Sequence, residues 1–257
     1  MLLTWDIHME NRNGWALVLM GVLLAAGMSA AAFILGGKFK TLGDNRQSIV
    51  VKGLAEKPVQ ADLAEWSLGL RVEGAQFAEA LEKMRKLRPV LNEFLATQGF
   101  PASGLEEGPE EVVPNMVEEA NARGDFRMVQ RGYVASQQLL LRSQDLARVT
   151  QAHKAIIQLA AEGHPVTYDA PRYLISDLES IKMSLIGAAT RNARQRAEEF
   201  AQVGNVQVGT MRSASQGAFY ILPASANSDA SDYGGVYDKS TIAKKARVVV
   251  TIDYGIE

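Results

Sequence analysis

The sequence contains no cysteine among its 257 residues. This absence excludes disulfide bridges, thiolate nucleophiles and cysteine-based metal sites together. It does not fix the cellular compartment, because a chain of this length can bury a sizeable core and fold in an oxidising space without bridges.

Histidines and familiar catalytic motifs are also scarce. The three histidines, His8, His153 and His164, have no metal-site spacing, and His153 is expected as a packed or half-exposed side chain on a helix. No G-x-S-x-G, Walker-type loop or G-x-G-x-x-G motif occurs. We therefore expect no catalytic residue, no cofactor and no metal ion, and a protein that is not an enzyme.

The charge balance is close to neutral, with a formal net charge of -2. No overall field therefore favours nucleic acid as a partner. One stretch is strongly acidic but lacks the spacing of a calcium loop, so we expect solvation of a loop rather than calcium binding. Its glutamates are Glu106, Glu107, Glu110, Glu111, Glu118 and Glu119.

Two basic clusters have ordinary structural interpretations. Arg191, Arg194 and Arg196 are expected on the solvent side of a helix, with contact to lipid headgroups or a partner as the alternative. Lys244, Lys245 and Arg247 begin a strand, where charge discourages unwanted edge pairing, and anion binding is the alternative.

The strongest positive signal is an apolar run near the start, from Gly14 to Gly37, without a charged residue. About 20 such residues span the hydrocarbon core of a bilayer. A buried helix of a soluble core is the competing interpretation, but such helices rarely lack a polar face over this length. The expected membrane-anchor residues are Trp15, Leu17, Leu19, Val22, Leu23, Leu24, Phe33, Ile34 and Leu35.

A cleaved signal peptide is the closer alternative, because residues 29–32 are small, as a signal peptidase requires. The apolar run continues through Phe33, Ile34 and Leu35, which favours an uncleaved anchor. Counting Lys and Arg alone favours a cytoplasmic C-terminus. The layout of a short leader, one apolar helix and a large domain favours the opposite orientation, which we adopt.

The pattern predicts four segments: a leader over 1–13, a transmembrane or signal-anchor helix over 14–37, a linker over 38–47 and one α+β domain over 48–257. In that domain, alternation of Trp66, Leu68, Leu70 and Val72 with polar residues predicts a half-buried strand. Helical spacing predicts helices over about 75–97, 143–163 and 176–203. Hairpins alternating with helices indicate mixed or mostly antiparallel sheets with packed helices.

Several local features refine this prediction. Pro89 should kink or divide the first of these helices. Ser143 is expected to cap the second, and Ser176 with Glu179 to form the capping box of the third. The last strand, Ala246 to Tyr254, is rich in valine, which suits a strand covered on both faces.

Two stretches are expected to be long loops, 101–125 (with one short strand) and 217–240. Residues 108–125 of the first and all of the second are the expected contact elements of an assembly, and the candidate contact residues of the second are Phe219, Tyr220, Tyr233 and Tyr237. Deleting the second stretch should leave a folded domain and change the assembly.

The order of several weak motifs resembles the SIMPL-domain family of bacterial periplasmic and outer-membrane-associated immunogenic proteins. The motifs are Ile49-Val50-Val51-Lys52-Gly53, Lys57-Pro58, residues 68–74 (LGLRVEG), residues 132–139 followed by Asp145-Leu146, the alanines of 188–201 with Val203-Gly204, and the strand from Ala246 to Tyr254. Two departures are Val59-Gln60 after the first-turn proline, where many relatives are acidic, and the apparent anchor.

This resemblance implies an extracytoplasmic α+β domain that assembles into large ring-like or cage-like homo-oligomers, with no catalytic residue to transfer. The expected location is the bacterial inner membrane, with a single pass, lipid around the helix and the soluble domain in the periplasm. Release into the periplasm after signal cleavage is the alternative. The expected role is structural or protective under envelope stress, and the alternative function is a small-ligand-binding module or an uncharacterised envelope enzyme.

Overall fold

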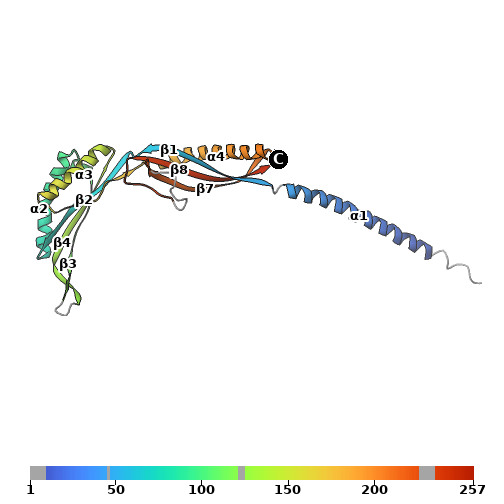
Figure 1. The fold of residues 1–257 in the computed structure, drawn as a ribbon. Helices are drawn as coiled ribbons and strands as arrows, with labels where there is room; N and C mark the ends of the chain where they lie inside the picture. Colours follow the sequence, from blue (N-terminus) through green and yellow to red (C-terminus); the bar gives the residue numbers. More distant parts are fainter. Residues whose placement is uncertain (1–9, 45–46, 121–124, 226–234) are drawn as a thin grey trace, which may run out of the picture. The chain divides into compact units, whose positions relative to one another are not determined.

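The computed structural model describes residues 10–44, 47–120, 125–225 and 235–257, and it has an α+β fold preceded by a long apolar helix (Figure 1). The helices are α1 Glu10–Asp44, α2 Phe77–Thr97, α3 Leu146–Ala161 and α4 Leu178–Val203, with a short 3-10 turn at Ala102–Gly104. The strands are β1 Ser48–Gln60, β2 Leu63–Gly74, β3 Leu105–Ala120, β4 Phe126–Ser143, β5 Val166–Tyr168, β6 Arg172–Leu174, β7 Val208–Pro223 and β8 Ala243–Ile256.

The chain divides into two compact units, and each is described by itself. One unit contains Leu54–Asn192 and Gln216–Val250. The other contains Met1–Gly53, Ala193–Ser215 and Thr251–Glu257.

A five-stranded antiparallel sheet forms most of the first unit, in the order β3-β4-β2-β5, with β6 also paired to β2. The expected alternation in β2 is confirmed, because Trp66, Leu68, Leu70 and Val72 are buried. Helices α2 and α3 contact this sheet and complete the core. The opposite face of β2 carries polar side chains.

The buried faces of α2 and α3 follow the predicted helical spacing. Met84 and Leu91 of α2 and Val149 and Ile156 of α3 are all buried in one cluster with β2. Pro89 lies inside α2, which remains one helix from Phe77 to Thr97 and is not divided.

A three-stranded sheet has the order β1-β8-β7, so the last strand of the chain is central. Along β8, alternate residues from Lys244 to Tyr254 are buried, while the residues between them are half-exposed. The expectation that both faces of this strand are covered was therefore wrong. Val248 and Val250 are buried, whereas Val249 between them is half-buried.

Helix α4 carries its buried face on small side chains. Ala189, Ala193, Ala197 and Ala201 recur at four-residue intervals and are buried. Phe200, expected in this face, is 63% exposed. Alanine at these positions lets a helix backbone lie close to its neighbours, and the larger phenylalanine is excluded from that face.

Three sequence-based details require correction. The predicted loop over 101–125 is largely the strand β3, and the predicted loop over 217–240 begins only after β7 ends at Pro223. The helix caps also lie one or two residues later than expected. Asp145 accepts a hydrogen bond from Arg148 N, and Asp177 accepts one from Ser180 N, each at 3.0 Å. Aspartate is as good a helix cap as serine, so the neighbouring Asp was an equally valid choice.

Gly132 in β4 has a required role where β4 leaves the pairing with β2. Its φ is +75°, and a Cβ there would overlap the carbonyl oxygen of Gly74. We expect Gly132→Ala to lower the free energy of unfolding by roughly 2–4 kcal/mol, from left-handed strain together with a backbone clash.

The matched control is Gly163→Ala, because Gly163 has a φ of +90° but open space around its missing Cβ. Gly163→Ala should lower the free energy of unfolding by about 1–2 kcal/mol, because it introduces left-handed strain but no clash. Urea unfolding of the full chain in mild detergent measures both, and equal losses would contradict the assigned clash.

Candidate functional site

The predicted membrane anchor lies on α1. The window Leu17–Ile34 has a mean hydropathy of 2.3 and none of it is buried. Trp15, Leu17, Leu19, Val22, Leu23, Leu24, Phe33 and Ile34 are all exposed, whereas the side chain of Leu35 lies outside the described residues. Helix α1 is therefore long and apolar enough to cross a membrane, and the described residues leave this window unburied.

The candidate assembly residues have different environments. Tyr220 is buried in β7 and Phe219 is half-buried beside it. Tyr237 is half-buried, and its hydroxyl accepts a 2.9 Å hydrogen bond from Ile175 N. Tyr233 lies outside the described residues. At least Tyr220 and Tyr237 help to hold the monomer together, so deleting 217–240 would remove part of the fold.

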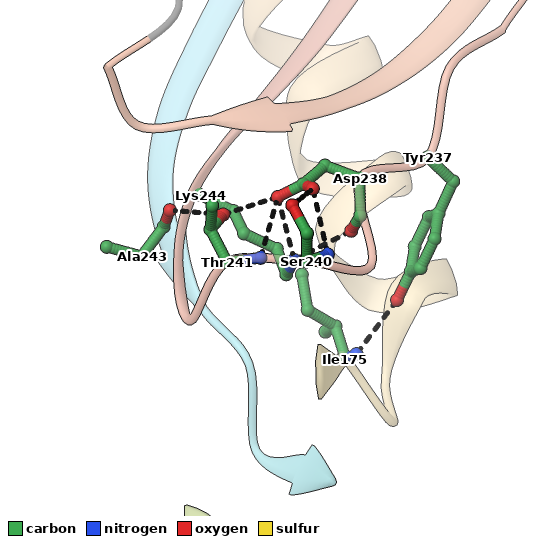
Figure 2. Close-up of polar contacts among 7 residues, drawn as sticks. All are labelled: Ile175, Tyr237, Asp238, Ser240, Thr241, Ala243 and Lys244. Atoms are coloured by element: carbon green, nitrogen blue, oxygen red, sulfur yellow. Dashed lines mark hydrogen bonds and ion pairs between the residues drawn. The ribbon is translucent and has the colours of Figure 1, made fainter. Parts of the chain in front are cut away.

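A buried ion pair lies between β7 and β8 in the chain (Figure 2). The Lys244 side chain is 0% exposed and that of Asp238 is 8% exposed. The Lys244 ammonium donates to the Asp238 carbonyl oxygen at 2.6 Å and to its carboxylate Oδ2 at 3.1 Å. The expected surface role of Lys244 was therefore wrong, because its position in β8 points inward to an anionic partner.

The Asp238 carboxylate is enclosed by donors from its own turn (Figure 2). Ser240 donates its N–H and hydroxyl to Oδ1 at 2.9 and 2.7 Å, and Thr241 donates its N–H and hydroxyl to Oδ2. Burial alone would raise the pKa of Asp238, but hydrogen bonds from Thr241, Ser240 and Lys244 outweigh burial and hold that pKa well below its ordinary value.

The segment around this ion pair connects three parts of the first unit. Ile221 N donates to Val236 O at 2.8 Å, and Tyr173 N donates to Lys239 O at 2.7 Å. Ala61 N donates to Ile242 O at 2.9 Å. These bonds connect β7, β6 and the β1–β2 turn to one segment, so the ion pair lies where three parts of this unit meet.

The open face of the five-stranded sheet carries an arginine–glutamate network. Arg142 donates to Glu65 at 3.0 Å and to Glu106 at 2.6 Å, and Arg172 also donates to Glu65. The hydrogen bond from Arg142, followed by that from Arg172, lowers the pKa of Glu65. These charges largely neutralise one another.

A shallow hollow of about 270 Å³ lies against this network, and its lining includes Ser67, Leu140 and Asp169. Its charged walls, Glu65 and Arg172, already form an ion pair. Binding a charged ligand there would require breaking that pair.

The acidic stretch belongs to β3 and is largely ion-paired. Glu107 pairs with Arg88 at 2.6 Å, and Glu110 pairs with Arg85 at 2.6 Å. Within the described residues no group of three or more histidines or carboxylates is arranged to hold a metal ion. The interpretation as a solvated loop was wrong, because this stretch pairs with β4 along most of its length, and its glutamates stand as three adjacent pairs within a strand.

The arginines of α4 have structural partners. Arg194 donates to the carbonyl oxygens of Val208 and Gly209, both at 3.3 Å, and its guanidinium lies 5.3 Å from the Tyr254 ring centroid. Arg196 donates to Lys52 O at 3.1 Å. The expectation of a purely solvated face was therefore incomplete, since these side chains bind strand backbone.

His153 is half-buried, as expected. Its ring meets Trp66 and Tyr168 edge-on, with ring centroids 5.8 and 5.9 Å apart. This is a packed aromatic contact in the core.

The part of β3 and β4 beyond the main sheet forms a two-stranded arm, defined as residues 116–120 and 126–130. Here β4 pairs only with β3 among the described strands, because the pairing of β2 with β4 stops at Tyr133. Directly opposite residues share a face, so Met116, Phe126 and Met128 lie on the same face of the arm. They are 47%, 69% and 60% exposed.

A family model described as SIMPL, protein of unknown function (DUF541), matches residues 49–254. The match therefore includes nearly all of the chain from β1 to β8. No curated protein matches the chain significantly.

The buried ion pair generates a stability prediction. Asp238→Ala should lower the free energy of unfolding by about 3–5 kcal/mol, because it leaves the Lys244 ammonium buried without its carboxylate. Lys244→Met should cost less, since Ser240 and Thr241 still satisfy Asp238. Lys245→Met is the control, because Lys245 lies next in the chain and is partly exposed, and it should change stability by less than about 1 kcal/mol.

The same experiment repeated against pH tests the sign of the pKa shift. The folded-state pKa of Asp238 is depressed, so its contribution is fully present above its ordinary value of 3.8 and is lost as pH falls below it. The difference between the wild type and Asp238→Ala should therefore shrink in acid. A constant difference down to the lowest pH at which the protein stays folded would contradict the assignment.

Proposed function

Because this chain belongs to the SIMPL family, we propose that it is a membrane-anchored, extracytoplasmic protein that self-assembles into a large oligomer with a structural or envelope-stress role. The observation that carries the proposal is the group of exposed apolar side chains on one face of the arm, Met116, Phe126 and Met128, which share that face with Glu118 and Gln130. The resemblance to SIMPL proteins, which implies self-assembly, agrees with that observation.

An exposed two-stranded ribbon is a costly feature for a protein that acts alone. A two-stranded hairpin is marginally stable in water, and three large apolar side chains on one face stay solvated. An aromatic side chain such as Phe126 buries about 150–250 Å² when covered. Covering this face with another protein surface removes that apolar area from water and stabilises the arm.

The arm alone is too small for a stable complex. A specific interface buries about 800 Å² on each partner, which is more than three side chains supply. The arm therefore acts as one contact among several, as in an assembly where each subunit meets more than one neighbour.

Helix α1 supports the proposed location. The described chain does not bury the apolar window of α1, and a lipid bilayer supplies an apolar environment of matching thickness. We assign α1 to the bacterial inner membrane as an uncleaved single-pass anchor, with the remaining domain in the periplasm. A protein of this kind needs no substrate, and we assign it no catalytic role.

The first test is the mass of the full chain extracted in mild detergent, beside a variant lacking residues 1–40. We expect a large discrete oligomer from both, because the exposed contact surfaces lie after α1, and we expect only the full chain to require detergent. Monomers from both would contradict the proposed assembly and would favour the alternative of a small-ligand-binding module.

The second test removes the apolar face of the arm through Phe126→Ser with Met128→Ser. Because both side chains are exposed in the monomer, unfolding should change little, while the oligomer should dissociate at concentrations about tenfold higher or more. Ile157→Ser on α3 is the control, since Ile157 is 56% exposed but lies outside the arm. An oligomer equally stable in the arm variant and the control would exclude the arm as a contact.

A further inference from the structure

We propose that residues 210–215 of β7 pair antiparallel with the same residues of a second copy of this chain, across a two-fold axis. The two β1-β8-β7 sheets would then join into one six-stranded sheet. This interface rests on the proposed self-assembly and specifies one of its contacts.

The first observation is exposure. Thr210, Met211, Arg212, Ser213, Ala214 and Ser215 are all exposed. A strand in a one-sided sheet buries every second residue, so six consecutive exposed residues mean that neither face of this stretch is covered. In the described chain, β7 is also at the end of the sheet order, so only β8 pairs with it along this stretch.

The second observation is that the other long sheet edges are already blocked. At β1, Asn192 accepts a hydrogen bond from Leu54 N at 3.1 Å, and Arg196 donates to Lys52 O. Side chains of α4 therefore occupy backbone groups that a new strand would need. Folded proteins commonly cover strand edges in this way to prevent pairing.

The remaining edges are blocked by charge or are short. Strand β3 carries six glutamates in 16 residues, and four of them, Glu106, Glu107, Glu110 and Glu119, form ion pairs with arginines. A new strand at this edge would meet these charged side chains. Strand β5 has only three residues. The edge of β4 over residues 126–132 is also open among the described strands, but it carries Arg127 and Arg131, whereas residues 210–215 of β7 carry only Arg212.

Charge also favours self-pairing of this segment. Arg212 is its one charged residue, and it lies beside Gly255 of β8. When antiparallel strands pair about a centre at Ser213 or between Ser213 and Ala214, Arg212 faces a small neutral residue and not its own copy. The small side chains on either side allow the approach of about 4.8 Å between strands that pairing requires.

The two-fold geometry determines what this contact can build. An isologous interface uses the same patch on both copies and closes at a dimer. A larger assembly needs a second, different contact, and the arm supplies one. Loss of the arm contact alone should therefore leave dimers.

The natural absence of cysteine makes a sharp test available. Single cysteines are placed in the full chain at each of positions 210–215, as in Ser213→Cys, and oxidised in mild detergent. Opposed residues in an antiparallel pair have Cα atoms about 4.5–5.5 Å apart, within disulfide reach. We expect cross-linked dimers to peak at one or two adjacent positions and to decline on both sides.

Thr167→Cys is the matched control, because Thr167 is an exposed residue of the edge strand β5. It should cross-link no more than background. Uniform cross-linking across 210–215, or a level equal to that of Thr167→Cys, would overturn the proposal. So would pairing with a different strand, such as β3 of a second copy, because single cysteines would then have no partner in register.

A charge exchange gives an independent measurement. Ser213→Lys with Ala214→Lys, and separately Ser213→Glu with Ala214→Glu, place like charges opposite each other in the pair. Each should raise the apparent dissociation constant of the dimer about tenfold, and mixing the two variants should restore it. Lack of restoration would overturn the proposal.

The two levels of proposal fail in different ways. A monomeric wild-type chain would overturn self-assembly and this interface together. If the wild type is an oligomer and both double variants at 213 and 214 form an oligomer of the same mass, only the pairing of β7 would be overturned.

Discussion

A fully buried ammonium group requires a permanent anionic partner, and residues 235–242, just before β8, are organised around that requirement. Lys244 occupies an inward position on β8, and Asp238 reaches it only because Ser240 and Thr241 hold the carboxylate in place. The backbone near Asp238 is fixed in turn, and it supplies hydrogen bonds to β7, β6 and the β1–β2 turn. One electrostatic constraint therefore helps to position residues 236–242, which form no helix or long strand of their own.

A second constraint acts at the strand edges, where neighbouring side chains limit which other strands can pair with a sheet. Side chains of α4 occupy backbone groups of β1, glutamates line β3, and β5 is short. The stretch 210–215 of β7 lacks all three protections. Among the described strands, this stretch is therefore a long edge with a single charged residue, Arg212, and the proposed pairing of two copies uses that edge.

The sequence predicted those features that depend on periodicity or length. The apolar run gave the membrane-length helix, alternation gave the buried face of β2, and helical spacing gave α2, α3 and α4. The sequence-based prediction failed where composition suggested a loop but pairing with a neighbouring strand determines the structure. The glutamates of β3 and the small residues of β7 are poor strand formers in isolation, and they form strands because β4 and β8 lie beside them. The buried role of Lys244 was equally hidden, because its partner lies six residues away in a polar stretch with no periodic pattern.

The position of β8 in the middle of its sheet sets an order of events during synthesis. Strand β1 lies next to β8, yet nearly 200 residues separate them in the chain, so β1 waits without its neighbour until the final strand emerges. Closing so long a loop costs conformational entropy and slows folding. Meanwhile, the β-branched residues Ile49, Val50 and Val51 have no β8 beside them. Until β8 has been synthesised, this edge of β1 is open to pairing with other strands.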